Sequence, residues 1–422
     1  MLSLFLLLCF VIQPFEPSTV HAEGLDIFVS ADGTGTDCTQ AAPCQPSQGL
    51  VNATDGDTIY FAEGTYTSST TDPILTVTKG VALVGGWDGA PTGVLVIDPD
   101  DYEAEFDGGG SRGLFRINSP SDVYDVSISG FVLRYGRTQF GGAIEVLDGK
   151  TIIENNGIKE NYASSYGGGV YTQAQDELVI RNNLFFSNTA KFGGGGVHLN
   201  RPSESEAAVI ENNIFLANAT DSGGYGGAID VSRSAAIINA NRISNTSNSS
   251  SAILVTSEEL VQITNNFIAW DTYAYANGAA INIYYEDGEE TQVINNTIVN
   301  ARTGIDDTLT AKANITNNIF YNCWKSIDLE TDSNFVGTNN LFYNNTSDPL
   351  LLSNPVTGLD PLFVNAASQD YHIQKDSPAV DAGAVVTLDH DFDGDARPIG
   401  DGYDIGADEW NIFQNYLPLI LR

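Results

Sequence analysis

Basic residues are scarce in this sequence. Its 422 residues include 18 Lys and Arg against 54 Asp and Glu, so the formal net charge is −36 at pH 7. A nucleic-acid partner is therefore not expected, because phosphate contacts require a basic surface. An anionic membrane surface is disfavoured for the same reason. Two interpretations of the acidic surface stay open, namely simple solubility outside the cell and the binding of divalent cations such as Ca²⁺.

Cysteine is also scarce, with four residues in the whole chain. Cys38 and Cys44 are six residues apart, and an exported protein would allow them to form a disulfide. Cys323 is then left over, and a small buried residue is favoured there over a nucleophile.

The N-terminal apolar run, residues 2–12, is too short to span a bilayer comfortably. It is followed by Val20-His21-Ala22, a small-x-small signature for cleavage. The basic residues that usually begin such a segment are missing. We predict a signal peptide over residues 1–22, export of the protein, and no membrane insertion after cleavage.

The informative feature of the sequence is a repeat. Asn-Asn and equivalent pairs recur at intervals of 22 to 30 residues, each preceded by a short β-type segment. Asn tolerates the left-handed backbone conformation of a sharp bend, and stacked bends would place its amides in a hydrogen-bonded ladder. An apolar residue two positions later is expected to fill a continuous core. The second positions of the pairs are Asn156, Asn183, Asn213, Asn241, Asn266, Asn296, Asn318 and Asn340, and the apolar residues are Ile158, Phe185, Phe215, Ile243, Ile268, Ile298, Phe320 and Phe342.

A second marker runs in parallel with the first. Glycines precede a short alternating segment, as in residues 141–146, 167–172, 194–199 and 226–231. The glycines permit a tight turn, and the segment alternates inward and outward as a strand does. If the Ile or Val after the glycines points inward, the next residue of each coil lies in one outward column. This column would comprise Glu145, Tyr171, His198, Asp230, Leu254, Asn282, Asp306 and Asp328.

Coils of two to three dozen residues leave no room for crossover helices, which argues against a doubly wound fold. Their irregular length argues against a left-handed hexapeptide helix. Over most of residues 57–345 the chain resembles the pectin-lyase-like right-handed β-helix superfamily. The resemblance implies an all-β, single-stranded right-handed parallel β-helix, a solenoid whose coils occupy residues 57–350. It does not specify an activity, since the same coil carries lyases, hydrolases, adhesins and inert scaffolds.

The N-terminal end is expected to differ from the repeat. Residues 23–56 should form a first strand, a loop and a short capping helix over residues 47–53. Such a cap is expected because an open coil end exposes unpaired backbone groups.

The C-terminal end, residues 351–410, resembles the choice-of-anchor Q segment that closes many exported bacterial β-helices. The resemblance implies an irregular closing segment and a bacterial extracellular or cell-surface protein. The tail, residues 411–422, carries no recognisable sorting signal. The motifs that carry the resemblance are Leu359-Asp360-Pro361-Leu362-Phe363, Ser377-Pro378-Ala379-Val380-Asp381-Ala382-Gly383 and Asp404-Ile405-Gly406-Ala407-Asp408-Glu409-Trp410.

The outward column has the composition of a polysaccharide-binding face. Acids, amides, an aromatic ring and an imidazole on a flat face are what β-helix proteins commonly present to glycans. Glu145, Asn282 and Arg302 are the candidate binding residues. The alternative is a solvated strand face, where polar outward residues are simply expected. On either interpretation His198→Ala should leave folding intact.

The same column offers candidate catalytic residues. Tyr171, His198 and Asp230 fall in consecutive coils, so Asp230 can orient the imidazole as a base while the phenol returns a proton. Asp306 and Asp328 are adjacent in the column and form a second candidate, either as an acid pair or as Ca²⁺ ligands. A charged surface without chemistry is the competing interpretation of both groups.

One short motif suggests a cation. Asp389, Asp391 and Asp393 alternate before Gly394, as in the first half of a calcium loop. The twelfth position is Gly400 rather than Glu, so an EF-hand is not supported. A looser Ca²⁺ site and Asx-turns in a closing loop are the two interpretations, and Ca²⁺ is the one cofactor that the sequence suggests.

These features predict an exported β-helix that binds extracellular polysaccharide or serves as a cell-surface scaffold. The alternative is a polysaccharide lyase or glycoside hydrolase that acts on an acidic glycan through the outward column. The sequence has no His-Gly pair or Arg-x-Lys segment of the polygalacturonase type, and no Arg-x-Pro-x-x-Arg of the pectate lyase type. These absences favour the binding function over the enzyme.

Overall fold

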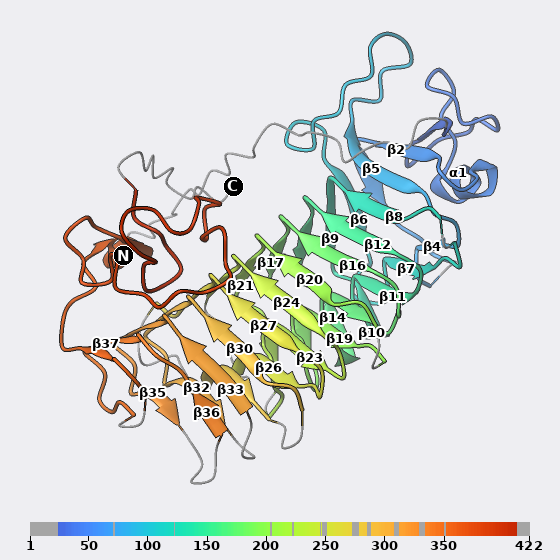
Figure 1. Cartoon of the computed structure of the whole chain (residues 1–422). Helices are drawn as coiled ribbons and strands as arrows, with labels where there is room; N and C mark the ends of the chain where they lie inside the picture. Colours follow the sequence, from blue (N-terminus) through green and yellow to red (C-terminus); the bar gives the residue numbers. More distant parts are fainter. Residues whose placement is uncertain are drawn as a thin grey trace, which may run out of the picture.

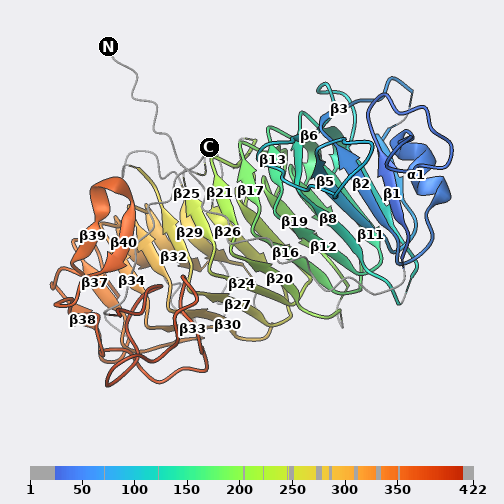
Figure 2. The same cartoon turned by 90° about the horizontal axis from the view of Figure 1, so that it is seen from above.

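The computed structural model describes residues 24–411 except 71, 122, 203–204, 222, 245, 247–250, 272–277, 285–287, 308–311, 329–333 and 350–351. The predicted signal peptide and residues 412–422 of the predicted tail lie outside the described residues. Within them the chain winds as one long solenoid of strands (Figures 1 and 2). The predicted all-β fold is confirmed.

Three long parallel sheets run along the solenoid, and each coil from β2 to β35 contributes one strand to each of them. The first sheet contains β1 (Asp26–Val29), β2 (Thr58–Ala62), β5 (Ala82–Trp87), β8 (Val126–Ser129), β12 (Thr151–Glu154), β16 (Leu178–Arg181), β20 (Ala208–Glu211), β24 (Ala236–Asn239), β27 (Val261–Thr264), β30 (Thr291–Ile294), β33 (Lys312–Thr316) and β36 (Asn334–Val336). The second sheet contains β4 (Leu75–Val77), β7 (Phe115–Asn118), β11 (Ile144–Asp148), β15 (Val170–Thr172), β19 (Val197–Asn200), β23 (Ile229–Ser232), β26 (Ser251–Thr256), β29 (Ala279–Ile283), β32 (Thr303–Asp307) and β35 (Lys325–Asp328). The third sheet contains β3 (Gly64–Tyr66), β6 (Ala104–Asp107), β9 (Phe131–Arg134), β13 (Gly157–Lys159), β17 (Leu184–Phe186), β21 (Ile214–Leu216), β25 (Arg242–Ser244), β28 (Phe267–Ala269), β31 (Thr297–Val299), β34 (Ile319–Tyr321), β37 (Leu341–Tyr343) and β38 (Val356–Thr357).

A fourth, short parallel sheet lies between the third and second sheets of four consecutive coils. It contains β10 (Arg137–Phe140), β14 (Tyr162–Tyr166), β18 (Thr189–Ala190) and β22 (Ala219–Thr220). The sequence did not predict this sheet, and it shapes the candidate site described below.

The core is a stack of apolar side chains in the predicted phase. Ile158, Phe185, Phe215 and Ile243 are register partners in successive strands of the third sheet, and all four are buried. The same register continues to Phe342 through Ile268, Ile298 and Phe320. The one-residue-per-coil core that the repeat predicted is confirmed.

The predicted asparagine ladder is also present. The first residue of each pair has a positive φ, as Asn182 (56°) and Asn212 (55°) show, and so makes the bend. The second residue points inward: the side-chain amide of Asn183 donates to Asn213 Oδ1 at 3.0 Å and to the Ile153 carbonyl at 2.8 Å. Because each buried amide finds partners in the adjacent coils, the ladder carries no desolvation penalty for unsatisfied groups.

The N-terminal end is capped as expected. Helix α1 spans Pro46–Asn52, one residue earlier than predicted, and packs over the first coil. A Cβ at Gly49 would lie 2.6 Å from Val29 Cγ1, so glycine lets the helix close on the core. Cys38 and Cys44 form the predicted disulfide in the preceding loop. No helix among the described residues is long and apolar enough to cross a membrane.

The C-terminal segment closes the fold from the side. We call residues 360–411 the clasp; it includes an antiparallel pair, β39 (Phe363–Asn365) and β40 (Asp370–Ile373), joined by the 3₁₀ turn η2 (Ala366–Ser368). Asn265, Asn295 and Asn339 donate side-chain hydrogen bonds to clasp carbonyls, and Arg242 donates to the Gln369 carbonyl. The clasp therefore lies along the last coils (Figure 1, red), fastened to asparagines of the bends.

Cys323 is buried, as the sequence predicted, and burial raises the pKa of its thiol to about 12. Since the thiolate is the reactive form, we expect native protein at pH 8 to show almost no reaction with a thiol reagent such as Ellman's reagent. Denatured protein of residues 23–422 should release one equivalent of the thionitrobenzoate product. Rapid labelling of the native protein would contradict the packing of the last coils.

Candidate functional site

The outward column forms as predicted. Strand register pairs Glu145 with Tyr171, Tyr171 with His198, and His198 with Asp230. The second sheet therefore presents one outward side chain per coil in a single line. The column continues through Leu254, Asn282, Asp306 and Asp328.

The middle of the column is not the open, solvated face that the sequence predicted. Tyr171, His198 and Asp230 are each only 4% exposed. The expectation was wrong because the short sheet of β10, β14, β18 and β22 and the residues that follow it cover this part of the second sheet. His198→Ala is therefore no longer expected to be silent for folding.

The cover carries a row of aromatic rings, one from each of four coils. We call Phe140, Tyr166, Phe192 and Tyr225 the aromatic row. The ring centroids of Phe140 and Tyr166 are 6.4 Å apart, and those of Tyr166 and Phe192 are 5.6 Å apart. Tyr225 is in register with Tyr166, because Gly193 of the coil between them forms a parallel bridge with each, and Phe192 precedes this glycine by one residue. Phe192 and Tyr225 are about half exposed, so the row forms a wall that borders solvent.

The aromatic row packs directly on the column. The Tyr166 ring lies 4.5 Å from the His198 ring between centroids, and the Phe140 ring lies 4.8 Å from the Tyr171 ring. Gly193 makes this approach possible, because a Cβ there would lie 2.0 Å from Asp230 Oδ2. The sequence therefore needs glycine at the point where the cover crosses the carboxylate.

His198 and Asp230 form a buried pair. His198 Nδ1 lies 2.9 Å from Asp230 Oδ2, and the Tyr171 ring stacks on the imidazole with a centroid distance of 5.6 Å. A carboxylate on Nδ1 fixes the tautomer with its proton there, which makes Nε2 an acceptor. The second carboxylate oxygen, Asp230 Oδ1, is buried and has no hydrogen-bond partner among the described residues.

A pocket of about 750 Å³ opens between the aromatic row and the column. His198 and Asp230 lie on its floor, and Tyr166, Phe192 and Tyr225 form one wall. We call it the aromatic pocket. Its remaining lining includes Lys191, Asn200, Asp221, Ser232, Arg233 and Thr256.

Two cationic side chains at the pocket were not anticipated from the sequence. Both Nε and Nη2 of Arg233 donate to Asn200 Oδ1, and the amide of Asn200 donates to the Tyr171 hydroxyl at 3.1 Å. Lys191 Nζ lies 5.0 Å from the centroid of the Phe192 ring. The pocket therefore combines positive charge, hydrogen-bonding groups and apolar ring faces within a strongly acidic protein.

The other predicted site residues lie outside the aromatic pocket. Glu145 forms an ion pair with Arg116 at 2.7 Å. Asp306 and Asp328 are register neighbours as predicted, but Asp328 is paired with Lys325 at 2.7 Å. Asp306 is three coils from Asp230 along the column, so the structure separates the two candidate catalytic groups. The remaining two residues are Asn282, whose amide lies 3.5 Å from Asp306 Oδ2, and Arg302, which lies over the Trp324 ring.

The three aspartates of the calcium-like motif do not converge. Asp391 is 2% exposed, and its two oxygens accept backbone N–H groups of Asp393, Asp395 and Glu409. Asp389 pairs instead with the adjacent His390. Asp391 therefore holds a turn through its hydrogen bonds, while Asp389 and Asp393 point to other partners.

The aromatic row has a signature in the sequence. Phe140, Tyr166 and Tyr225 directly precede the glycine marker, and Phe192 stands two positions before its copy at residues 194–199. Aromatic residues at or next to one phase of four coils predict a line of rings on the solenoid.

Comparisons with known proteins address the fold. The sequence pattern of the family described as right handed beta helix region matches residues 103–268. The chain is a right-handed parallel β-helix. The crystal structure of pectate lyase Pel9A is similar to it with 12% identity and a TM-score of 0.51, covering 93% of this chain and 98% of that one. The complex structure of XylC with xylose is equally similar, with 12% identity, a TM-score of 0.51 and coverage of 91% and 98%. No curated protein matches the sequence.

Proposed function

We propose that this β-helix binds an extracellular polysaccharide in the aromatic pocket. The observation that carries the proposal is the pairing of two surfaces across one pocket: rings of Tyr166, Phe192 and Tyr225 face a floor that holds His198 and Asp230. Sugar rings have apolar faces that pack on aromatic side chains and hydroxyl edges that bind polar groups. Binding sites for small molecules typically have a small number of well-placed polar groups among apolar walls.

The unpartnered oxygen of Asp230 supports this assignment. A buried carboxylate oxygen without a hydrogen bond is costly, and a ligand that donates to it removes that cost. A sugar hydroxyl is a donor of the required kind. The line of coils on both sides of the pocket suits a polymer better than an isolated sugar. The two similar structures, a pectate lyase and a complex with xylose, are themselves named for carbohydrates.

A second candidate function is a polysaccharide lyase that acts on a uronate. The observation that favours it is the His198–Asp230 pair beside the two cations, Lys191 and Arg233. Lys191 and Arg233 would neutralise the uronate carboxylate, and His198 Nε2 would take the proton from the adjacent carbon. The electrons left on that carbon form the new double bond as the glycosidic oxygen leaves with a proton from Tyr166, which takes the role expected of Tyr171 because Tyr166 lines the pocket and Tyr171 does not. This role is general acid–base catalysis.

Both functions would be carried out outside the cell, which is where the signal peptide expected over residues 1–22 would direct the protein. A bacterial source and attachment to the cell surface through the C-terminal segment are part of the same proposal. A nucleic-acid partner stays disfavoured by the charge of −36.

The test is retention of residues 23–422 on a panel of immobilised acidic and neutral polysaccharides, with Ca²⁺ and with EDTA. We expect one glycan class to retain the protein and Phe192→Ala to weaken that binding about tenfold or more, as for an aromatic contact worth at least 1.4 kcal/mol. Phe192 is 47% exposed, so its loss should not unfold the protein. The matched control is Tyr284→Ala, an aromatic residue 40% exposed outside the pocket, which should bind as the wild type does.

The same panel separates the two functions. Absorbance from unsaturated products that disappears in His198→Gln, with binding retained, would establish the lyase. Retention without product would establish the binding protein. Equal weakening by Phe192→Ala and Tyr284→Ala, or no retention on any glycan, would refute the aromatic pocket as the site.

A further inference from the structure

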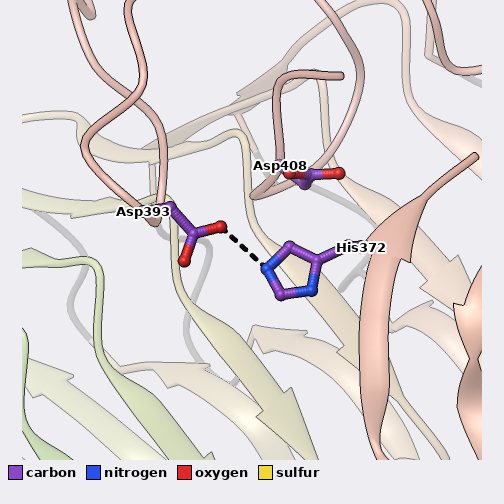
Figure 3. A group of neighbouring side chains, drawn as sticks. All are labelled: His372, Asp393 and Asp408. Atoms are coloured by element: carbon purple, nitrogen blue, oxygen red, sulfur yellow. Dashed lines mark hydrogen bonds and ion pairs between the residues drawn. The ribbon is translucent and has the colours of Figure 1, made fainter. Parts of the chain in front are cut away.

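Three donor groups of the clasp converge at a place that the glycan proposal does not use. His372 lies on β40, Asp393 in the turn after His390, and Asp408 near the end of the clasp. One ligand atom from each lies within 4.8 Å of the other two, and Figure 3 shows Asp393 facing the His372 ring with Asp408 beside them. None of them lines the aromatic pocket.

The imidazole is held in the orientation that a metal ligand requires. His372 Nδ1 lies 2.5 Å from Asp370 Oδ1, which fixes the ring, while Nε2 faces Asp393 Oδ2 at 2.8 Å. A carboxylate on the far nitrogen is the usual outer partner of a metal-bound histidine. The proton between His372 and Asp393 occupies the position that a cation would take, since metal binding displaces ligand protons.

Asp408 supplies a buried anionic ligand. It is 1% exposed, and its Oδ2 accepts the Ile373 backbone N–H at 2.7 Å, which fixes the carboxylate from outside the group. Because the carboxylate is buried, water solvates its charge poorly. A divalent cation would offset this concentration of carboxylates more fully than the single imidazolium does.

The surroundings of the group are apolar on one side. The Phe267 ring lies 5.6 Å from the His372 ring, and the Phe392 ring lies 6.5 Å from it. Phe267 belongs to β28 of the solenoid, so the group lies where the clasp meets the coils. An apolar shell around mixed nitrogen and oxygen donors limits solvent access and strengthens a bound cation.

We propose that His372, Asp393 and Asp408 bind one divalent transition-metal ion, with Zn²⁺ the best fit, and that Asp370 positions His372. One imidazole and two carboxylates suit Zn²⁺, and they leave a fourth position for water. An imidazole ligand disfavours Ca²⁺, which takes oxygen ligands. The ion would connect β40 to the two later turns of the clasp that carry Asp393 and Asp408. This site shares Asp393 with the calcium site expected at Asp389, Asp391 and Asp393, but it takes its other two ligands from outside that motif.

The test uses tag-free residues 23–422 stripped of metal and titrated with Zn²⁺ by calorimetry, and with Co²⁺ by visible absorption. We expect one equivalent to bind, with Co²⁺ bands of a low-coordinate site and a higher unfolding temperature. Asp393→Asn, at a side chain 44% exposed, should lower the Zn²⁺ affinity about 100-fold or more while the circular dichroism stays unchanged. Asp370→Asn should lower it about 10- to 100-fold, as loss of an outer partner does.

Asp389→Asn is the matched control, because Asp389 is an exposed acid in the same turn and should leave the affinity unchanged. Failure of the wild type to bind Zn²⁺, or equal binding by Asp393→Asn, would overturn the site. Displacement of Zn²⁺ by equimolar Ca²⁺ would overturn the choice of metal. Glycan retention is measured on the same variants and should not change, so failure here is distinguishable from failure of the proposed function.

Discussion

Replacing Phe215 by alanine is expected to lower the free energy of unfolding by about 3–5 kcal/mol. Phe215 is fully buried, and its ring stacks on that of Phe185 at 4.6 Å between centroids. Its other register partner is Ile243 of the next coil. The coils are held one strand spacing apart by their backbone hydrogen bonds, so they cannot move together to fill the space. The variant therefore loses both the buried surface of the ring and the packing around it.

The measurement is denaturant unfolding together with hydrogen exchange of β17, β21 and β25. Exchange is the more local probe, because coils of a solenoid contribute nearly independent stabilities. Phe192→Ala is the matched control, since it removes the same atoms from a side chain that is 47% exposed, and it should cost less than about 1 kcal/mol. Equal losses of unfolding free energy in the two variants would mean that Phe215 does not point into the core of the solenoid.

Replacing Arg397 by leucine is expected to destabilise the clasp by about 3–5 kcal/mol. Arg397 and Glu409 form an ion pair at 2.8 Å in which both side chains are completely buried. Arg397 Nη2 also donates to the Gly406 carbonyl at 2.8 Å, while Glu409 Oε1 accepts the Ile399 backbone N–H. Removal of the guanidinium leaves a buried carboxylate without its counter-charge. The cost is that of an unpaired buried charge rather than the net value of the pair.

Hydrogen exchange and limited proteolysis of residues 360–411 measure this effect, because the clasp can open while the coils stay folded. Lys325→Leu serves as the control: Lys325 pairs with Asp328 at a similar distance, 2.7 Å, but the two side chains are 32% and 43% exposed. Exposed pairs of this kind contribute about 0–1 kcal/mol. A clasp that stayed protected in Arg397→Leu would show that docking on the asparagines, rather than the buried pair, holds it in place.

The repeat made much of the solenoid predictable from the sequence. Asn183 and Asn213 mark the positions of the bends, and Phe185 and Phe215 each follow two residues later. Because every coil repeats the same path, a residue at one phase must lie one strand spacing above its equivalent in the coil before. The ladder, the core and the outward column follow from this geometry without any knowledge of the loops. For the same reason Tyr171, His198 and Asp230 could be placed in one line.

The tertiary structure decided what lies over the column and what lies beside the coils. Burial of His198 depends on the path of the chain between the third and second sheets, whose length varies from coil to coil. The clasp meets Arg242 through Gln369, which is 127 residues away in sequence, and it brings His372, Asp393 and Asp408 together from separate turns. A repeat fixes only relations between neighbouring coils. Contacts that irregular segments make across many coils have no period in the sequence. The sequence by itself therefore determined the solenoid and its outward column, whereas the aromatic pocket and the His372 group could be located only in the tertiary structure.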